Sequence, residues 1–206
     1  MARKSKRTVE FRRKREKKTD YKNRLKLLLN DKPRLVVRKS SKNVQVQLIS
    51  YETKGDKIIV SAHTSELKKL DWNFGCGNIP AAYLVGYLVG KRMITKGIKE
   101  TILDVGLQGK GNRLFSVLKG VIDAGIIIPH KDKILPSDEL IKGEHINKYT
   151  EKLSADKEKY NKQFSAYIKN NCNTKDISKT IDQVKEKMDK KWLKKKKLRK
   201  KRSKKP

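Results

Sequence analysis

Two short segments and two aspartates are of residue types that enzymes use to bind nucleotides or metal ions. Gly75-Cys76-Gly77 lacks the third glycine of a dinucleotide-binding fingerprint, and Gly109-Lys110-Gly111 lacks the serine or threonine that follows the lysine of a phosphate-binding loop. Asp104 and Asp123 are candidate metal ligands, but metal-dependent nucleases usually cluster three or four carboxylates, and the sequence shows no such set. The favoured interpretations are a backbone loop that approaches RNA or protein closely, and a structural or turn role for Asp104.

The cysteines and histidines form no metal-ligand pattern. Cys76 and Cys172 lie far apart in the sequence, neither belongs to a CxxC pair, and the three histidines are scattered. We therefore expect no bound metal, no cofactor, no catalytic residue and no enzymatic activity. Both thiols are expected to be reduced, in a cytosolic protein.

The net charge is the strongest compositional signal. Lysine and arginine number 54 against 22 acidic residues, a formal net charge of +32. Repulsion on that scale disfavours a compact monomer unless a polyanion supplies the counter-charge, so nucleic acid is the expected partner. A membrane surface also attracts basic proteins, but the longest apolar run, 79–90, is too short to span a bilayer. Residues 1–20 are basic throughout and lack the apolar segment of a signal peptide. We expect no membrane partner and no small-molecule substrate.

The positive charge is concentrated at the two ends of the chain. Residues 1–40 contain 17 basic and 4 acidic side chains, whereas residues 136–190 are nearly balanced, with 12 against 10. The last sixteen residues contain 11 basic groups and no acid. This distribution is typical of a folded domain with polycationic arms.

Aromatic rings are interleaved with the cations of the first arm. Phe11 stands within a basic run, and Tyr21 follows. Cations neutralise phosphates while an aromatic ring stacks on an unpaired base, so these types together favour RNA binding. The alternatives are a solvated arm with Phe11 on the domain's own surface, and strand glutamines that merely face solvent. The candidate RNA-binding residues are Arg7, Phe11, Arg12, Arg13, Lys14, Arg15, Tyr21 and Arg24 in the arm, Arg34, Arg38, Lys42, Gln45 and Gln47 near the strands, and Lys194, Lys195, Lys196 and Arg199 in the tail.

The apolar pattern of the middle segment predicts the elements that must position these residues. Alternating or short apolar runs predict strands at 35–37, 44–48, 58–60, 101–105 and 126–128. Helical spacing predicts helices at 78–97 and 112–125, with Asn78 and Asn112 as their N-caps and Gly125 at the end of the second. Gly86 and Gly90, four residues apart, are expected to let the first helix approach a neighbour closely. The order βββαβαβ predicts a three-layer α/β fold with a mixed sheet.

The remaining chain reads as a charged helical extension followed by a tail. Ile177, Ile181, Val184 and Met188 form a narrow apolar stripe, which we expect to dock on a partner rather than to form a core. Residues 191–206 are of low complexity and are expected to lack structure until bound. The expected organisation is a basic arm at 1–32, an α/β core domain at 33–135, a charged helical extension at 136–190 and a lysine-rich tail at 191–206.

Several segments, in the right order, resemble one known family. The run from Phe11 to Tyr21 is similar to the basic arm of the archaeal large-subunit ribosomal protein eighteen family, whose longer eukaryotic relative is called large-subunit protein five. The similarity covers roughly residues 8–146 and no single motif carries it. The other segments are Lys32-Pro33-Arg34-Leu35-Val36-Val37-Arg38-Lys39-Ser40, Glu66-Leu67-Lys68-Lys69, Trp72, Gly77-Asn78-Ile79-Pro80-Ala81-Ala82-Tyr83, Leu103-Asp104-Val105-Gly106-Leu107 and Leu118-Lys119-Gly120-Val121-Ile122-Asp123-Ala124-Gly125.

This resemblance implies a ribonuclease-H-like α/β fold without nuclease activity, in the cytoplasmic large ribosomal subunit. The implied partner is 5S ribosomal RNA in the central protuberance, together with large-subunit ribosomal RNA and neighbouring proteins that include the other 5S-binding protein. The residues that the match implies for RNA contact are Phe11, Arg12, Arg13, Arg15, Thr19, Tyr21, Arg24, Arg38 and Asn43. The alternatives are a metal-dependent ribonuclease-H-like nuclease and a non-ribosomal RNA chaperone.

Overall fold

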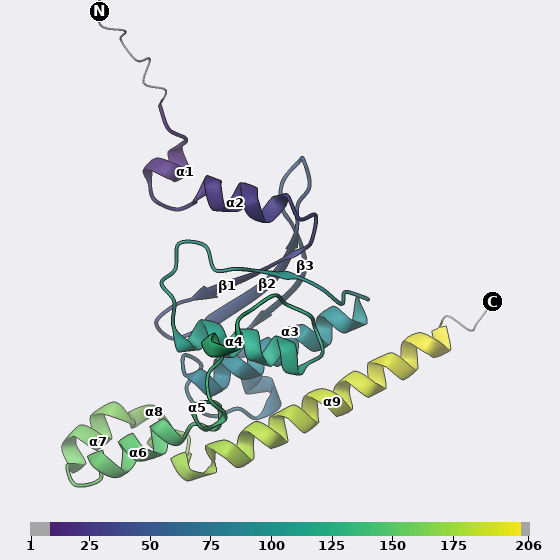
Figure 1. Ribbon diagram of the computed structural model, residues 1–206. Coiled ribbons are helices and arrows are strands. Elements are labelled where there is room, and N and C mark those ends of the chain that lie inside the picture. The colour runs from purple at the N-terminus through teal and green to yellow at the C-terminus, as the bar shows by residue number, and fades with distance from the viewer. Residues whose placement is uncertain (1–8, 203–206) are drawn as a thin grey trace, which may run out of the picture.

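The centre of the molecule is a four-stranded mixed sheet (Figure 1). The computed structural model describes residues 9–202, and the side chains of residues 9–192. The first three strands form an antiparallel meander and the fourth pairs in parallel with the first, giving the order β3-β2-β1-β4. The bounds are β1 (Arg34–Lys39), β2 (Val44–Ser50), β3 (Lys57–His63) and β4 (Ile102–Asp104).

The two faces of the sheet differ in polarity, as the period-2 pattern predicts. Leu35, Val37, Val46 and Leu48 are at most 1% exposed and face the helices, which confirms the predicted strands. The residues that alternate with them along the strands point away from the helices. Among these, Arg38 of β1 and Gln45 of β2 lie directly opposite each other and are exposed. One face is therefore a core. The other is buried at Arg34, Val36 and Ile49 and open at Arg38 and Gln45.

The predicted fifth strand at 126–128 is wrong. The chain makes only an isolated parallel bridge between Glu100 and Ile127, just beyond the N-terminal end of β4. Its hydrogen bonds run from Thr101 N to Ile127 O, 3.1 Å, and from Ile127 N to Lys99 O, 2.9 Å. Ile126 and Ile128 are still buried, so the apolar run reflects core packing without a strand ladder.

Two helices cover the inner face of the sheet, α3 (Ile79–Thr95) and α4 (Asn112–Asp123). The Asn78 side chain accepts a hydrogen bond from Ala81 N, 2.8 Å, and Pro80 occupies the first turn, so the predicted start of α3 is confirmed. Asn112 was expected to cap α4, and this is wrong. The N-cap is Gly111, no side chain caps the helix, and Asn112 is its first residue.

Glycines let α3 and α4 cross with their backbones in contact. A Cβ atom placed on Gly86 would overlap the carbonyl oxygen of Val117, and one placed on Gly120 would overlap the carbonyl oxygen of Tyr83. One on Gly90 would overlap the Ala124 methyl group. The close approach expected at Gly86 and Gly90 is confirmed, and the matching glycine of α4 explains how it is achieved.

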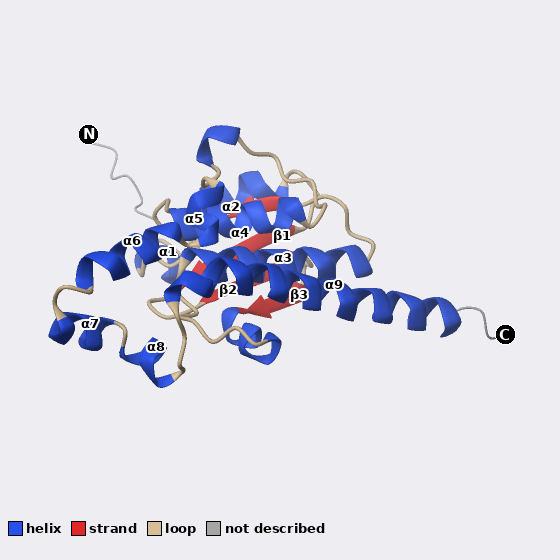
Figure 2. Ribbon diagram, turned by 90° about the horizontal axis from the view of Figure 1, so that it is seen from below, coloured by secondary structure: helices blue, strands red, loops and turns tan. Residues whose placement is uncertain are grey.

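The apolar stripe of the C-terminal helix α9 (Ile177–Arg202) packs on this core, so its expected docking on a partner is wrong. Ile177, Ile181, Val184 and Met188 are at most 3% exposed and belong to the same cluster as the sheet and α3. The views from the side and from below show α9 running alongside α3 (Figures 1 and 2). The apolar stripe of α9 is too narrow to form a separate core, but it is wide enough to cover the core formed by the sheet and α3.

Polar contacts between neighbouring turns fix α9 on α3. Tyr83 donates to Asp123 at 2.8 Å and accepts from Lys185 Nζ at 3.1 Å. Burial, with the adjacent Asp123 carboxylate, raises the pKa of Tyr83. One turn along, Asp189 accepts from the Tyr87 hydroxyl at 3.1 Å and pairs with Lys91 at 2.8 Å.

The backbone of α9 is helical as far as Arg202, so the expected lack of structure in 191–206 does not hold for 191–202. None of the helices in the described part of the chain is long and apolar enough to cross a membrane. The shorter helices complete the chain: η1 (Thr64–Leu70), η2 (Asp132–Ile134), α5 (Asp138–Lys142), α6 (Glu144–Leu153), α7 (Lys157–Gln163), α8 (Ser165–Lys169) and η3 (Thr174–Asp176).

Candidate nucleic-acid interface

The N-terminal arm lies on the side of the sheet opposite α3 and α4 (Figure 1). It contains two short helices, α1 (Arg12–Arg15) and α2 (Tyr21–Leu28). Asp20 caps α2 by accepting from Asn23 N at 3.0 Å. Arg13 Nε donates to Thr19 Oγ1 at 2.9 Å, which closes the turn between the two helices. Within residues 9–32 the arm therefore contains two helices held together by side-chain contacts.

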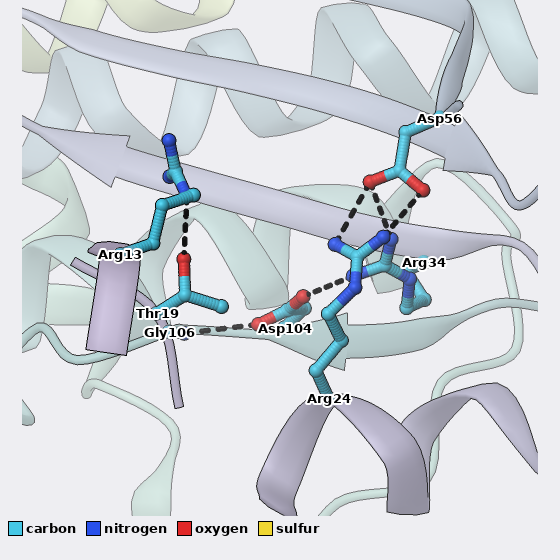
Figure 3. A network of polar contacts seen from close by, with 7 residues as sticks. All are labelled: Arg13, Thr19, Arg24, Arg34, Asp56, Asp104 and Gly106. Atoms are coloured by element: carbon cyan, nitrogen blue, oxygen red, sulfur yellow. Dashed lines mark hydrogen bonds and ion pairs between the residues drawn. The ribbon is translucent and has the colours of Figure 1, made fainter. Parts of the chain in front are cut away.

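A network of four charged residues joins the arm to the sheet (Figure 3). Arg24 of α2 makes a two-pronged contact with Asp56 of the β2–β3 hairpin, at 2.9 and 2.8 Å. Asp56 also accepts from Arg34 at 2.9 Å, and Arg34 donates to Asp104 at 2.7 Å. We call Arg24, Asp56, Arg34 and Asp104 the arm latch, because they connect α2, the hairpin, β1 and β4.

Electrostatics within the arm latch favour its charged form. Partial burial alone raises the pKa of Asp56, but the hydrogen bonds and charges of Arg24 and Arg34 outweigh it, and the net pKa lies below the ordinary value. The hydrogen bond to Asp56 raises the pKa of Arg24. Because the folded-state pKa of Asp56 is lowered, its contribution to the free energy of unfolding is complete at pH values above the ordinary carboxyl pKa. That contribution disappears as the pH falls through the folded-state value.

The aromatic residues of the arm remain largely in solvent. Phe11 is 72% exposed and its ring centre lies 5.3 Å from that of Tyr21, which is 36% exposed. Phe11 is therefore not part of the protein's core. The two rings form an exposed aromatic pair beside the cations of α1.

The four cations of α1 are all exposed, and three of them make only local contacts. Arg12 and Lys14 pair with Glu16 and Glu10, one turn away on the same segment, and Arg13 contacts Thr19 as above. Such surface pairs contribute little to stability and exchange readily for phosphate partners. The cations of α1 are thus accessible from solvent.

The open face of the sheet continues this polar surface. Arg38 of β1 and Gln45 of β2 are directly opposed and exposed, and Gln47, half-buried, lies opposite Val36. Beyond them, at the β1–β2 turn, Lys42 is exposed. Asn43 is half-buried and accepts from Thr64 Oγ1 at 3.2 Å. The structure therefore brings the predicted strand residues onto one face, on the same side as the arm.

A cleft of about 560 Å³ separates the arm from this open face. Arg13 and Tyr21 line it from the arm, and Val36 and Arg38 line it from β1. Gln108, from the glycine-rich loop after β4, also lines it and accepts from Lys39 N at 3.0 Å. Arm, strand and loop residues that are far apart in sequence thus share one concave surface.

Some of the predicted RNA contacts do not lie on this concave surface or cannot be placed on it. Arg7 lies outside the described residues, as do the side chains of Lys194, Lys195, Lys196 and Arg199. Arg24 lies within it but is paired with Asp56, so in this structure it holds the arm in place. Arg34 is 3% exposed and paired with Asp56 and Asp104, so its expected place among the RNA-binding residues is wrong.

The carboxylates considered as metal ligands have structural partners. Asp104 pairs with Arg34 and also accepts from Gly106 N at 3.0 Å, which confirms the structural or turn role favoured for it. Asp123 accepts from Tyr83. Within residues 9–192 no group of three or more His, Cys, Asp or Glu side chains is placed to hold a metal ion.

Comparisons with known proteins show the family of this chain. A family model described as ribosomal large subunit proteins 60S L5 and 50S L18 matches residues 5–102. Large ribosomal subunit protein uL18 of Methanococcus maripaludis is 48% identical over 190 residues, which cover 91% of this chain and 98% of the relative. The protein of the same name from Korarchaeum cryptofilum is 45% identical over 190 residues, covering 91% and 97%. The chain belongs to the uL18 family of large ribosomal subunit proteins.

The segment matched by the uL18 family model contains most of the candidate interface. Residues 5–102 include the arm, the first three strands and α3. The two relatives extend the similarity to most of the remaining chain. The resemblance noted in the sequence is thereby confirmed.

Asp56 is the residue of this site that sequence reasoning missed. It was assigned no role from the sequence, because nothing in its local sequence shows that a carboxylate there meets arginines 22 and 32 residues away. The available signal is weak: an acid in a hairpin turn of a chain with a large surplus of cations.

We expect Asp56→Asn to loosen the arm. The neutral amide cannot form the charged two-pronged contact, so the backbone amides of α2 should exchange with deuterium about threefold to tenfold faster in the free protein. Glu52→Gln is the matched control, because Glu52 lies in the same hairpin, loses the same charge and pairs with Lys57, at 3.2 Å, instead of with the arm. Unchanged exchange in α2 of Asp56→Asn would show that the arm is held by other contacts.

Proposed function

We propose that this chain is a non-catalytic structural constituent of the large ribosomal subunit that binds 5S ribosomal RNA. It helps to anchor that RNA in the central protuberance of the cytoplasmic ribosome, in contact with large-subunit ribosomal RNA and neighbouring proteins, including the other 5S-binding protein. The arm and the open face of the sheet form the principal RNA-binding surface, and the lysine-rich tail supplies further phosphate contacts.

The observation that carries this proposal is the latched arm. Arg24 and Asp56 hold α2 against the domain, while Phe11 and the cations of α1 remain exposed at the edge of a cleft. RNA is recognised by phosphate contacts together with stacking of unpaired bases on aromatic rings, and this surface offers both. Family membership supports the ribosomal assignment.

The mixed sheet has features of one particular α/β fold. We infer a ribonuclease-H-like arrangement from the antiparallel meander, the parallel β4 and the bridge at Ile127. The partners of Asp104 and Asp123 support a non-catalytic member of that fold, because both carboxylates are engaged by the protein itself.

Two substitutions in the arm separate stacking from charge. Phe11→Ala is expected to weaken 5S binding by about 1–3 kcal/mol and to leave the salt dependence nearly unchanged, because the ring neutralises no phosphate. Arg13→Ala should weaken binding modestly and make the slope of log affinity against log salt shallower by about 0.7 to 0.9. Filter-binding titrations at several salt concentrations measure both quantities.

Phe11→Tyr is the control, because it retains the ring face and should bind nearly as tightly as the wild type. If Phe11→Ala lowers the melting temperature and leaves RNA affinity intact, the ring serves the protein's own packing. The stacking role would then be withdrawn.

A further inference from the structure

A second concave surface lies at the far end of the β1–β2 hairpin from the latch. It is a groove of about 820 Å³ between the β1–β2 turn, the loop 73–78 and helix α8. We call it the hairpin groove. The function assigned above does not use its walls, apart from Lys42 and Asn43 of the turn.

The lining of the hairpin groove is rich in hydrogen-bond donors and contains no carboxylate among the described residues. Lys42 and Lys68 supply positive charge. In contrast, the cleft beneath the arm is lined by three acidic side chains. The two acids nearest to the hairpin groove in sequence are engaged elsewhere, since Glu66 pairs with Arg92 and Asp71 pairs with Lys187.

The amide and hydroxyl groups in the hairpin groove have donors to spare. Asn78 uses its carbonyl oxygen to cap α3, and its Nδ2 atom is buried without a partner among the described residues. Asn43 accepts through Oδ1 from Thr64, which leaves its amino group for a ligand. Tyr167 accepts from Gly75 N at 3.4 Å, which leaves its hydroxyl proton to donate.

The walls are held together before any ligand binds. Arg113 donates to Ser40 O at 3.0 Å and to Gly77 O at 3.2 Å, joining the hairpin turn to the loop. A Cβ atom on Gly77 would lie 2.8 Å from Ser41 O, so a larger residue would push these rims apart. Asn170 Nδ2 donates to Asn73 O at 3.0 Å and ties the α8 side to the same loop.

We propose that the hairpin groove binds the sugar-phosphate backbone of a second segment of the RNA that the arm holds. Lysine, serine, asparagine, tyrosine and backbone N–H groups are the donors that proteins use for phosphate and sugar, and the hairpin groove offers these types without a competing acid. The open face connects the two sites, because Arg38 and Gln45 lie between the arm and the turn that carries Lys42. This inference rests on the proposed function.

A matched pair of lysines tests the hairpin groove in the full chain. Lys68 and Lys69 are neighbours in η1 and both are exposed, but only Lys68 lines the hairpin groove. Lys68→Glu is expected to weaken 5S binding about fivefold to tenfold and to make the salt slope shallower by about 0.7 to 0.9, whereas Lys69→Glu changes affinity less than about twofold. Equal effects of the two substitutions would overturn the proposal.

Cys76 gives a second readout that requires no substitution. It is half-buried in the hairpin groove wall, while Cys172 is not among the lining residues, so peptide mass spectrometry after iodoacetamide treatment compares a site with an internal control. Saturating 5S RNA is expected to slow alkylation of Cys76 several-fold more than that of Cys172. Equal protection by inorganic phosphate alone would indicate a small-anion site and overturn the RNA assignment.

The two proposals fail in distinguishable ways. If the wild-type chain prefers 5S RNA over a control RNA but Cys76 stays unprotected in the saturated complex, the hairpin groove inference fails and the arm assignment stands. If the wild type shows no preference for 5S RNA, the proposed function itself fails.

Discussion

Gly120→Ala is expected to destabilise the protein by more than about 4 kcal/mol, a large fraction of the roughly 5–15 kcal/mol that keeps a typical domain folded. Helix propensity alone would make this substitution stabilising by about 1 kcal/mol, so the sign depends on the crossing of α3 and α4. A methyl group at this position overlaps the Tyr83 carbonyl oxygen, and α3 cannot retreat without uncovering the sheet or α9. Circular dichroism melts and the yield of soluble protein measure the effect.

Gly109→Ala is the matched control, because a Cβ atom there meets nothing within 4 Å. It is expected to change stability by less than about 0.5 kcal/mol. A Gly120→Ala protein that melts like the wild type would show that the two helices do not cross as closely as described.

Neutralising α1 should have the largest effect on RNA binding. Changing Arg12, Arg13, Lys14 and Arg15 to glutamine removes four exposed cations that make only local contacts or none within the described residues. If each cation neutralises one phosphate, the salt slope of the variant should be shallower by about 3, which corresponds to roughly 10²-fold weaker binding at physiological salt. The core makes no use of these side chains, so the melting temperature should be nearly unchanged.

The control is a variant with the same reduction of charge far from the arm. Lys148, Lys152, Lys157 and Lys162 are exposed on α6 and α7. Their change to glutamine is expected to weaken RNA binding less than about threefold, by reducing the general field of the protein. If both variants lose affinity equally, binding depends on total charge and not on the arm.

The elements with a clear period were predictable from the sequence, and those set by distant partners were not. The short apolar run of β1, the alternation of β2 and the Asn78 cap each follow from a few adjacent residues. The bridge at Ile127 looked like a strand because buried apolar runs give the same signal with or without a ladder. The apolar stripe of α9 was expected to dock on a partner because it is narrow. The width of a stripe does not show whether a partner or the protein's own core covers it.

The candidate site divides in the same way. Residue types alone predicted an RNA-binding role for Phe11 and the cations of α1, which stays a prediction, and the alternation of β2 placed Gln45 and Gln47 on one face. The role of Arg24 was not visible, because it depends on Asp56, which is 32 residues away in the sequence. Long-range ion pairs of this kind are fixed by the tertiary fold.

The most direct test of the central claim is a competition experiment with the full chain at a fixed, physiological salt concentration. Labelled 5S ribosomal RNA is bound and then displaced with either unlabelled 5S RNA or a structured RNA of equal length. Our account predicts at least roughly 10²-fold tighter binding of 5S RNA, because shape and stacked bases add to the phosphate contacts that both RNAs offer. Equal displacement by the two competitors would contradict it, and would indicate a protein that binds RNA through charge alone.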